Sequence, residues 1–362
     1  MRSSTLSALL TGGILCTVAA GLLSFPSEIS QAICEGLSLC GTILLPNLFP
    51  FFVLSALAVH LGLSGVLGRL LEPLMQPLFR LPGACASALI LGFLGGYPTG
   101  AKTAVSLYQS GHCTKDQAQR LLGFCNNCGP AFLIGVVGIG QFGHLFYGLL
   151  LAGVHVTSAI LCGVFLSIHA PKEMHPIKKR DPESFLPLPR AFTKAVTDSA
   201  QSLLNLFSFV LCFCALLRLF QLSVIPRISA RFLLPFLSGS NGESLLAGLL
   251  EMTNGVAGIR SGSTQERLIL TSLLLGWGGL SVHCQTRSLL GDCNLSPTYY
   301  WKGKALHALL SAALMALILW QAEVLCCLCG FLLLTLPKAH RKKDVEKPRK
   351  IYYNGCSLKK EL

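Results

Sequence analysis

Residues 92–100 read Gly-Phe-Leu-Gly-Gly-Tyr-Pro-Thr-Gly, and they interrupt a stretch that is otherwise apolar. Glycine and proline both end helices, because glycine is conformationally free and proline lacks a backbone N–H. The flanking segments, residues 84–94 and 101–110, are each too short to cross a membrane alone. We therefore expect a re-entrant helical hairpin whose tip, residues 95–100, lies at membrane depth.

The composition is that of a membrane protein. Of 362 residues, 52% are hydrophobic and only 12% are charged, and the mean hydropathy is +0.61. Soluble proteins carry about 25% charged residues. Four apolar segments reach the roughly 20 residues that cross a hydrocarbon core: Thr5 to Ser24, Phe142 to Ile168, Leu203 to Leu222 and Ala305 to Leu336. The chain is therefore expected to be an all-α, polytopic integral membrane protein of the cell membrane, and a secreted globular protein is excluded.

The interrupted pattern occurs twice. Gly248 to Gly255, with the sequence Gly-Leu-Leu-Glu-Met-Thr-Asn-Gly, follows the first hairpin by about 156 residues, and the Asn-Leu-Phe run at Asn47 returns after about 158 residues. Each hairpin is followed by a capping-box pattern and then by a broken helix. The boxes are Thr114 with Gln117 and Ser263 with Glu266, and the breaks are residues 126–130 and 276–279.

This order predicts two repeats, residues 26–170 and 195–337, each with an opening span, a re-entrant hairpin, a broken helix and a closing span. An odd number of crossings in each repeat makes the two repeats inverted in topology, as in many secondary transporters. Chance similarity between leucine-rich segments is the alternative.

The remaining segments flank these repeats. Residues 1–25 are expected to be an N-terminal transmembrane anchor, with a cleaved signal peptide as the alternative. The linker, residues 171–194, and the tail, residues 338–362, are both basic, and the tail is expected to be disordered and to bind anionic lipid. Inversion places linker and tail on opposite faces, whereas basic flanks normally mark the cytoplasmic face. The side on which the linker lies is left open.

Several functions are not expected. The net charge of +13 is concentrated in the linker and the tail, so nucleic-acid binding is not predicted. Most of the 16 cysteines lie in apolar segments, where cysteine behaves as a small hydrophobic residue. Cys125 and Cys128 have CxxC spacing, but no second pair completes a zinc site. We find no nucleophile–base pair, phosphate-binding loop or metal-ligand set, so no enzyme, cofactor or metal is predicted.

The helix breaks supply the candidate binding residues. Non-helical backbone at membrane depth is tolerated only where it faces protein or a wet cavity, so polar groups at the breaks can contact a solute. The predicted solute-binding residues are Gly96, Tyr97, Thr99, Asn126, Asn127, Glu251, Thr253, Asn254, His283 and Gln285. A tyrosine can stack on a planar ligand, and the amides and hydroxyls can form hydrogen bonds with it.

Glu251 is the most informative of these residues, because its apolar neighbours place a carboxylate at depth. Acids at depth usually mark an ion, proton or substrate path. Alternatively, Glu251 caps the second half-helix or pairs with Lys102 or Arg260. Lys102 either forms an ion pair or extends to the interface. His283 is either structural or, if it faces the cavity, suited to proton coupling.

Five runs carry a resemblance to a known family: Leu45–Val53, Leu94–Lys102, Cys125–Phe132, Leu250–Gly255 and Gly276–Gln285. Over about residues 30–335 the chain resembles the sporulation integral membrane proteins of the YlbJ type, within the wider group that carries the nucleoside-recognition "Gate" domain. The resemblance implies a role in endospore formation in a Firmicutes-type bacterium. It also implies kinship with the Gate regions of concentrative nucleoside transporters and ferrous-iron transporters.

Two functions follow as hypotheses. The first is a transporter or permease that moves a small solute through a cavity between the two hairpin tips. The alternative is a non-transporting membrane scaffold needed for assembly of the spore envelope (cortex). Its partners would be a second copy of the chain, as a homo-oligomer, or other sporulation membrane proteins.

Overall fold

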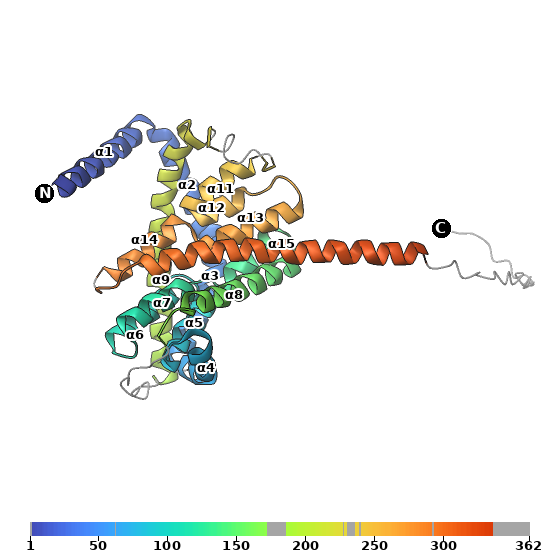
Figure 1. The fold of residues 1–362 in the computed structure, drawn as a ribbon. Helices are drawn as coiled ribbons and strands as arrows, with labels where there is room; N and C mark the ends of the chain where they lie inside the picture. The colour runs from blue at the N-terminus through green and yellow to red at the C-terminus, as the bar shows by residue number, and fades with distance from the viewer. Residues whose placement is uncertain are drawn as a thin grey trace, which may run out of the picture. The chain divides into compact units, whose positions relative to one another are not determined.

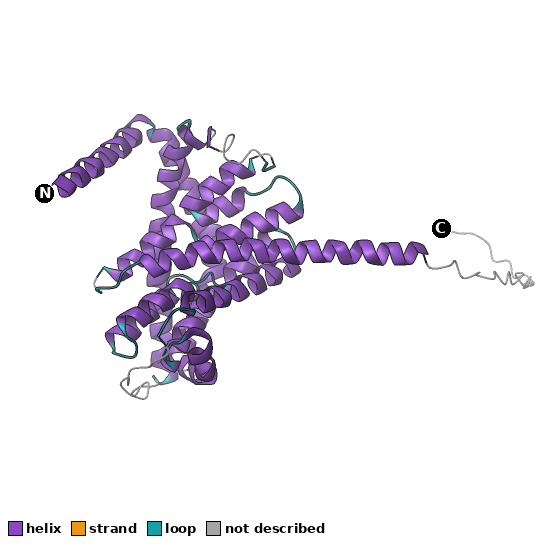
Figure 2. Ribbon diagram, viewed as in Figure 1, coloured by secondary structure: helices purple, strands orange, loops and turns teal. Residues whose placement is uncertain are grey.

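A computed structural model describes residues 2–61, 63–171, 186–226, 228–229, 236–238, 240–291 and 293–335. Every regular element in these ranges is a helix (Figures 1 and 2). Five helical segments within them are long and apolar enough to cross a membrane: Pro26–Ala58, Leu145–Ser167, Leu188–Leu222, Thr264–Leu290 and Thr298–Ala322. The predicted all-α, polytopic membrane fold is confirmed.

The first half of the chain contains the predicted re-entrant hairpin and the predicted broken helix. Its elements are α1 (Arg2–Ser24), α2 (Pro26–Ser38), the π-helix η1 (Leu39–Leu44), α3 (Leu45–His60), α4 (Leu63–Phe79), the 3₁₀-helix η2 (Gly83–Cys85), α5 (Ala86–Gly95), α6 (Thr99–Gln109), α7 (Lys115–Cys125), the π-helix η3 (Ala131–Gln141) and α8 (Leu145–Ser167). The hairpin is formed by α5 and α6, and the broken helix by α7 and η3. Between α4 and α5 the chain bends by 108°.

The second half repeats this order. Its elements are α9 (Leu188–Leu222), α11 (Asn241–Leu250), α12 (Met252–Gly258), α13 (Thr264–Trp277), α14 (Gly279–Leu290) and α15 (Thr298–Thr335). Here α11 and α12 form the hairpin, and α13 and α14 form the broken helix. The chain divides into two compact units, Met1–Leu319 and Trp320–Leu362, and the packing described below belongs to the first.

Two predicted capping boxes have different outcomes. At the start of α7, Thr114 and Gln117 form both hydrogen bonds of the box. At the start of α13, Ser263 Oγ accepts from the Glu266 N–H, but the Glu266 side chain does not return to Ser263. Its carboxylate instead accepts from Ser238 N at 2.8 Å, from Ser238 Oγ and from Asn241 Nδ2 at 2.9 Å. The second box is therefore only half formed, because Ser238 in the loop before α11 and Asn241 at the start of α11 offer this carboxylate three other donors.

The start of α9 differs from its predicted position. The helix begins at Leu188, so residues 188–194, predicted as the end of the linker, form its first turns. The cause is local: Pro187 is extended and a second proline occupies the first turn, where its missing N–H costs nothing. Residues 172–185 of the linker and the whole basic tail lie outside the described residues.

The packed interior has two apolar clusters. One gathers around the hairpin tips and the second broken helix and includes Tyr97, Phe132 and Leu274. The other lies between α4, α5, α7 and the start of α15, where the Phe79 and Phe124 rings stack with centroids 4.9 Å apart. Side-chain packing in these clusters holds the half-helices in place where the backbone hydrogen bonds of a continuous helix are interrupted.

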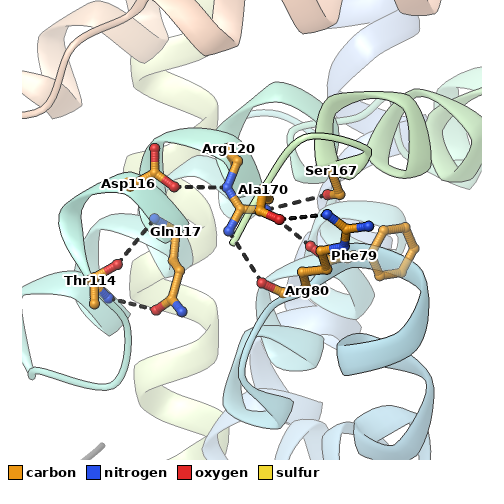
Figure 3. A network of polar contacts seen from close by, with 8 residues as sticks. All are labelled: Phe79, Arg80, Thr114, Asp116, Gln117, Arg120, Ser167 and Ala170. Carbon is orange, nitrogen blue, oxygen red and sulfur yellow. Dashed lines mark hydrogen bonds and ion pairs between the residues drawn. The ribbon is translucent and has the colours of Figure 1, made fainter. Parts of the chain in front are cut away.

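Two arginines close the ends of helices in the first half (Figure 3). Arg120 on α7 is buried, and its guanidinium donates to the carbonyl oxygens of Phe79 at 3.0 Å and Arg80 at 3.2 Å, where α4 ends. It also pairs with Asp116 at 2.9 Å. Arg80 in turn donates to the carbonyls of Ile168 and Ala170, beyond the end of α8. Each guanidinium satisfies carbonyls that a helix terminus leaves without partners.

Candidate functional site

The four helix breaks contact one another in series. A Cβ built on Gly96, at the first hairpin, would lie 2.9 Å from Gly129 N of the first broken helix. A Cβ on Gly278, at the second broken helix, would lie 3.0 Å from the Tyr97 hydroxyl. A Cβ on Gly279 would lie 2.7 Å from Met252 N of the second hairpin. Breaks from both halves of the chain therefore meet in one place.

Glycine is required at these contacts for two reasons. Gly96, Gly278 and Gly279 have φ values of 70°, 86° and 79°, a region that side chains with a Cβ rarely adopt. Their neighbours are backbone atoms or a packed tyrosine. In the first hairpin, α5 and α6 pack so closely against the end of α7 that a Cβ on Gly92 or Gly100 would overlap the Cys125 carbonyl oxygen.

A cavity of about 50 Å³ lies among the breaks. Both hairpin tips and the first broken helix line it, together with α14 just after the second broken helix's break. Apolar side chains of α3 and α9 complete its wall, among them Leu48, Phe52 and Val210. Its polar lining comes from Tyr97, Glu251, Thr253, Ser281 and Gln285. Gln285 Nε2 is buried there and has no hydrogen-bond partner. The cavity therefore combines apolar walls with a few polar groups, as small-molecule sites do.

Glu251 separates the two helices of the second hairpin and is 2% exposed. It is the N-cap of α12: its carboxylate accepts from Thr253 N at 3.1 Å, from Asn254 N at 2.7 Å and from Asn254 Nδ2 at 2.9 Å. Neither proposed basic partner reaches it, because Lys102 is exposed and Arg260 Nε donates to the Ala257 carbonyl. Glu251 thus caps a half-helix and lines the cavity at the same time.

Asn254 lies on the other face of α12. It lines a polar groove of about 410 Å³, together with Glu35, Arg218 and Glu243. Its side-chain nitrogen donates both to Glu251 and to Cys214 Sγ, the latter at 3.3 Å. Because Glu251 lines the cavity and Asn254 lines the groove, their hydrogen bond marks the boundary between the two spaces.

The other predicted residues line neither space. Thr99 is the first residue of α6 and packs on Gly95. Asn126 Nδ2 donates to Thr286 Oγ1 at 2.9 Å and so ties the first broken helix to α14, whereas Asn127 Nδ2 donates to the Phe124 carbonyl of α7 itself at 2.8 Å. Asn127 Oδ1 is buried without a partner. His283 is buried between Trp277 and Tyr300, with its Nε2 3.2 Å from the Trp277 carbonyl.

A buried polar stripe behind the cavity was not predicted. It joins the two closing helices: His155 and Ser158 on α8 face His307 and Ser311 on α15, and the imidazole centroids are 4.5 Å apart. Lys304, also on α15, is 1% exposed and donates to Tyr97 Oη at 3.0 Å and to the Asn126 carbonyl at 3.2 Å. The signal was present as polar residues at helical spacing, 304, 307 and 311, inside an apolar span.

The backbone N–H of Cys128 donates to His155 Nε2 at 3.1 Å, so this nitrogen is the acceptor and Nδ1 carries the ring proton of the neutral imidazole. Nδ1 of both His155 and His307 is buried without a partner. Among the described residues, no three His, Cys, Asp or Glu side chains are grouped so that they could hold a metal ion.

The chain is similar in sequence to known membrane proteins. Residues 41–144, which include the first hairpin and first broken helix, match the Gate family, described as nucleoside recognition. The chain is 28% identical over 346 residues to the sporulation integral membrane protein YlbJ of Bacillus subtilis (strain 168), which covers 89% of this chain and 85% of that protein. The resemblance expected from the sequence runs is thereby confirmed.

Solved structures of a membrane transporter share the fold. A variant of CNTnw in its intermediate 3 state matches with a TM-score of 0.51 and 15% identity, over 87% of this chain and 84% of that chain. CNTnw in an inward-facing, substrate-bound state matches with a TM-score of 0.50 and 14% identity, over 87% of both chains. The chain is therefore a multi-pass membrane protein with a transporter-like fold.

Proposed function

We propose that this protein is a permease-like transporter that moves a small solute through the cavity between its four helix breaks, and that it acts in spore formation. The observation that carries the proposal is the convergence itself. Breaks from both halves line one cavity that contains a carboxylate and an unpartnered amide. Broken helices facing each other at a repeat interface form the substrate sites of many secondary transporters.

The groove beyond Asn254 is the route by which the cavity would reach water. The α11–α12 hairpin, with its Glu251–Asn254 hydrogen bond, lines both the groove and the cavity. Movement of this short hairpin would open the cavity to the groove, and a break of one residue at Glu251 provides the hinge. Alternating access would then require displacement of helices that are already interrupted.

The lining restricts the class of solute. A space of about 50 Å³ holds a few water molecules or an ion and lies far below the roughly 300 Å³ of a typical small-molecule pocket. A larger solute would bind only after the hairpin moves. The apolar wall and the few hydrogen-bonding groups favour a small, partly apolar solute with at least one acceptor for Gln285. The role in sporulation rests on the similarity to YlbJ.

The test compares two serines on neighbouring helices. Ser281 on α14 lines the cavity, whereas Ser272 on α13 is equally buried but lies outside it. In the native spore-forming host, we expect Ser281→Val, which narrows the cavity, to lower the yield of heat-resistant spores. Ser272→Ala should leave the yield unchanged. Protein levels of each variant are checked by immunoblot.

The scaffold alternative has one observation in its favour. The Glu251 carboxylate is satisfied by its own hairpin and the cavity is small, as expected of a site that no longer takes a solute. A scaffold depends on its outer surfaces and tolerates a filled cavity. Wild-type spore yield from Ser281→Val at normal protein level would therefore favour the scaffold and reject transport.

A further inference from the structure

The Asn126 carbonyl lacks the donor that a continuous helix would supply. Asn126 is the C-cap of α7, and the residue four positions later is Pro130, which has no backbone N–H. The end of a helix also carries a partial negative charge. At this position the break leaves an acceptor oriented toward the interior, with no donor from its own helix.

Lys304 fills this position from the other half of the chain. A Cβ on Gly303 would overlap the Gly123 backbone, so α15 touches α7 one turn before the break. The next residue, Lys304, places Nζ 3.2 Å from the Asn126 carbonyl oxygen and 3.0 Å from Tyr97 Oη. Nζ also lies 5.1 Å from the centroid of the Tyr97 ring, within range of a cation–π contact.

The tyrosine extends the contact to the second broken helix. Having accepted from Lys304, Tyr97 Oη donates to the Leu275 carbonyl at 3.4 Å, in the last turn of α13. The ammonium group therefore contacts the C-terminal end of α7 directly, and it is linked to the C-terminal end of α13 by hydrogen bonds through the Tyr97 hydroxyl. Among the described residues, no Asp or Glu forms an ion pair with Lys304. Its positive charge is met by helix ends instead of a carboxylate.

In secondary transporters, a mobile coupling cation is held by carbonyl oxygens of unwound backbone and by the C-terminal ends of half-helices. We propose that the Lys304 ammonium is a tethered cation which occupies this position permanently. It stabilises the two broken helices in the role that a bound Na⁺ would otherwise have. Because α15 holds the charge covalently, it does not leave with the solute, and neither stability nor solute movement requires Na⁺. The part that concerns solute movement rests on the proposed function, and the part that concerns stability does not.

The experiment measures the Tm of the purified full-length protein in detergent, in chloride salts of sodium, choline and propylammonium at equal concentration. Wild type should have the same Tm in all three salts. Lys304→Ala should lose about 5 °C or more in choline chloride and regain most of it in propylammonium chloride, because propylammonium replaces the missing part of the side chain. Lys302→Ala, an exposed lysine on the same helix, should match wild type in every salt.

Two results would overturn the proposal. One is a Lys304→Met variant as stable as wild type in choline chloride, because the charge would then be unnecessary. The other is a wild-type protein that sodium stabilises and choline does not, and this measurement decides the matter even if no Lys304 variant folds. Stability and flux also separate the two proposals. Solute flux that depends on sodium supports transport and rejects the tethered cation. If propylammonium restores the Tm of Lys304→Ala but wild type moves no solute, the tethered cation is supported and transport is rejected.

Discussion

Replacing Glu251 with glutamine tests whether the carboxylate acts as a cap, as part of the cavity, or as both. The carboxylate accepts three hydrogen bonds, two of them on one oxygen. A glutamine has a single acceptor oxygen, which best faces the two donors of Asn254. Its NH₂ group then meets the Thr253 N–H, so one hydrogen bond is lost and two donors face each other.

The expected loss follows from this count. A hydrogen bond to a charged group contributes about 1.5–3 kcal/mol, so Glu251→Gln should lower the free energy of unfolding by about 2 kcal/mol. For a chain of this size the Tm should fall by roughly 3 °C. Glu243→Gln is the matched control, because Glu243 lies in the same hairpin but is exposed; its change should stay within about 0.5 kcal/mol.

Tm and spore yield together separate the roles. If Glu251 also contacts the solute, Glu251→Gln abolishes activity at temperatures where the variant is fully folded, and Glu251→Asp, which keeps the charge and a capping side chain, retains part of it. If Glu251 is only a cap, spore yield returns to normal a few degrees below the lowered Tm. An unchanged Tm in Glu251→Gln would refute the capping geometry itself.

Three further predictions follow. Gly96→Ala should destabilise the protein by about 1–3 kcal/mol from backbone strain alone, and by more because the added Cβ meets Gly129. Gly153→Ala should not destabilise it, because nothing lies within 4 Å of a Cβ at that position. Equal Tm values for both variants would contradict the contact between the first two breaks. Arg120→Met should cost about 2–6 kcal/mol, because it leaves the Phe79 and Arg80 carbonyls unpaired at about 1–3 kcal/mol each. Asp116→Asn should cost under about 1 kcal/mol because this partner is half exposed, with the order checked by thermal unfolding. Deleting residues 341–362 should leave membrane insertion intact and weaken binding to anionic vesicles, each basic residue contributing about 1 kcal/mol at most; loss of the protein from the membrane fraction would show that the tail contains a structural element.

The sequence was most informative where the helices break. Glycine, proline and asparagine have strong local preferences, so the hairpins and broken helices could be located without tertiary information. The regular spacing of the two sets then indicated that they belong together. Glu251 was found for the same reason, since a carboxylate next to a break in an apolar segment has few explanations.

The sequence was less informative about which way side chains face. Lys304, His155 and His307 lie within long apolar helices, and the face they occupy becomes the buried one only because α8 and α15 pack against each other. Thr99 and His283 flank breaks, as the cavity residues do. The left-handed turn at Gly278 and the helical start of α6 direct them elsewhere. These directions depend on the tertiary path of the chain, which no local pattern encodes.

The central claim is that a small solute passes between the four helix breaks, and uptake into vesicles tests it most directly. Purified full-length protein is reconstituted into liposomes and incubated with a small-molecule extract of sporulating cells, and the vesicle contents are compared by mass spectrometry. The account predicts that at least one compound is enriched by wild type and by Ser272→Ala, but not by Ser281→Val or by empty liposomes. If no compound is enriched above empty liposomes by a wild-type protein that supports normal spore formation in cells, the transport account is contradicted.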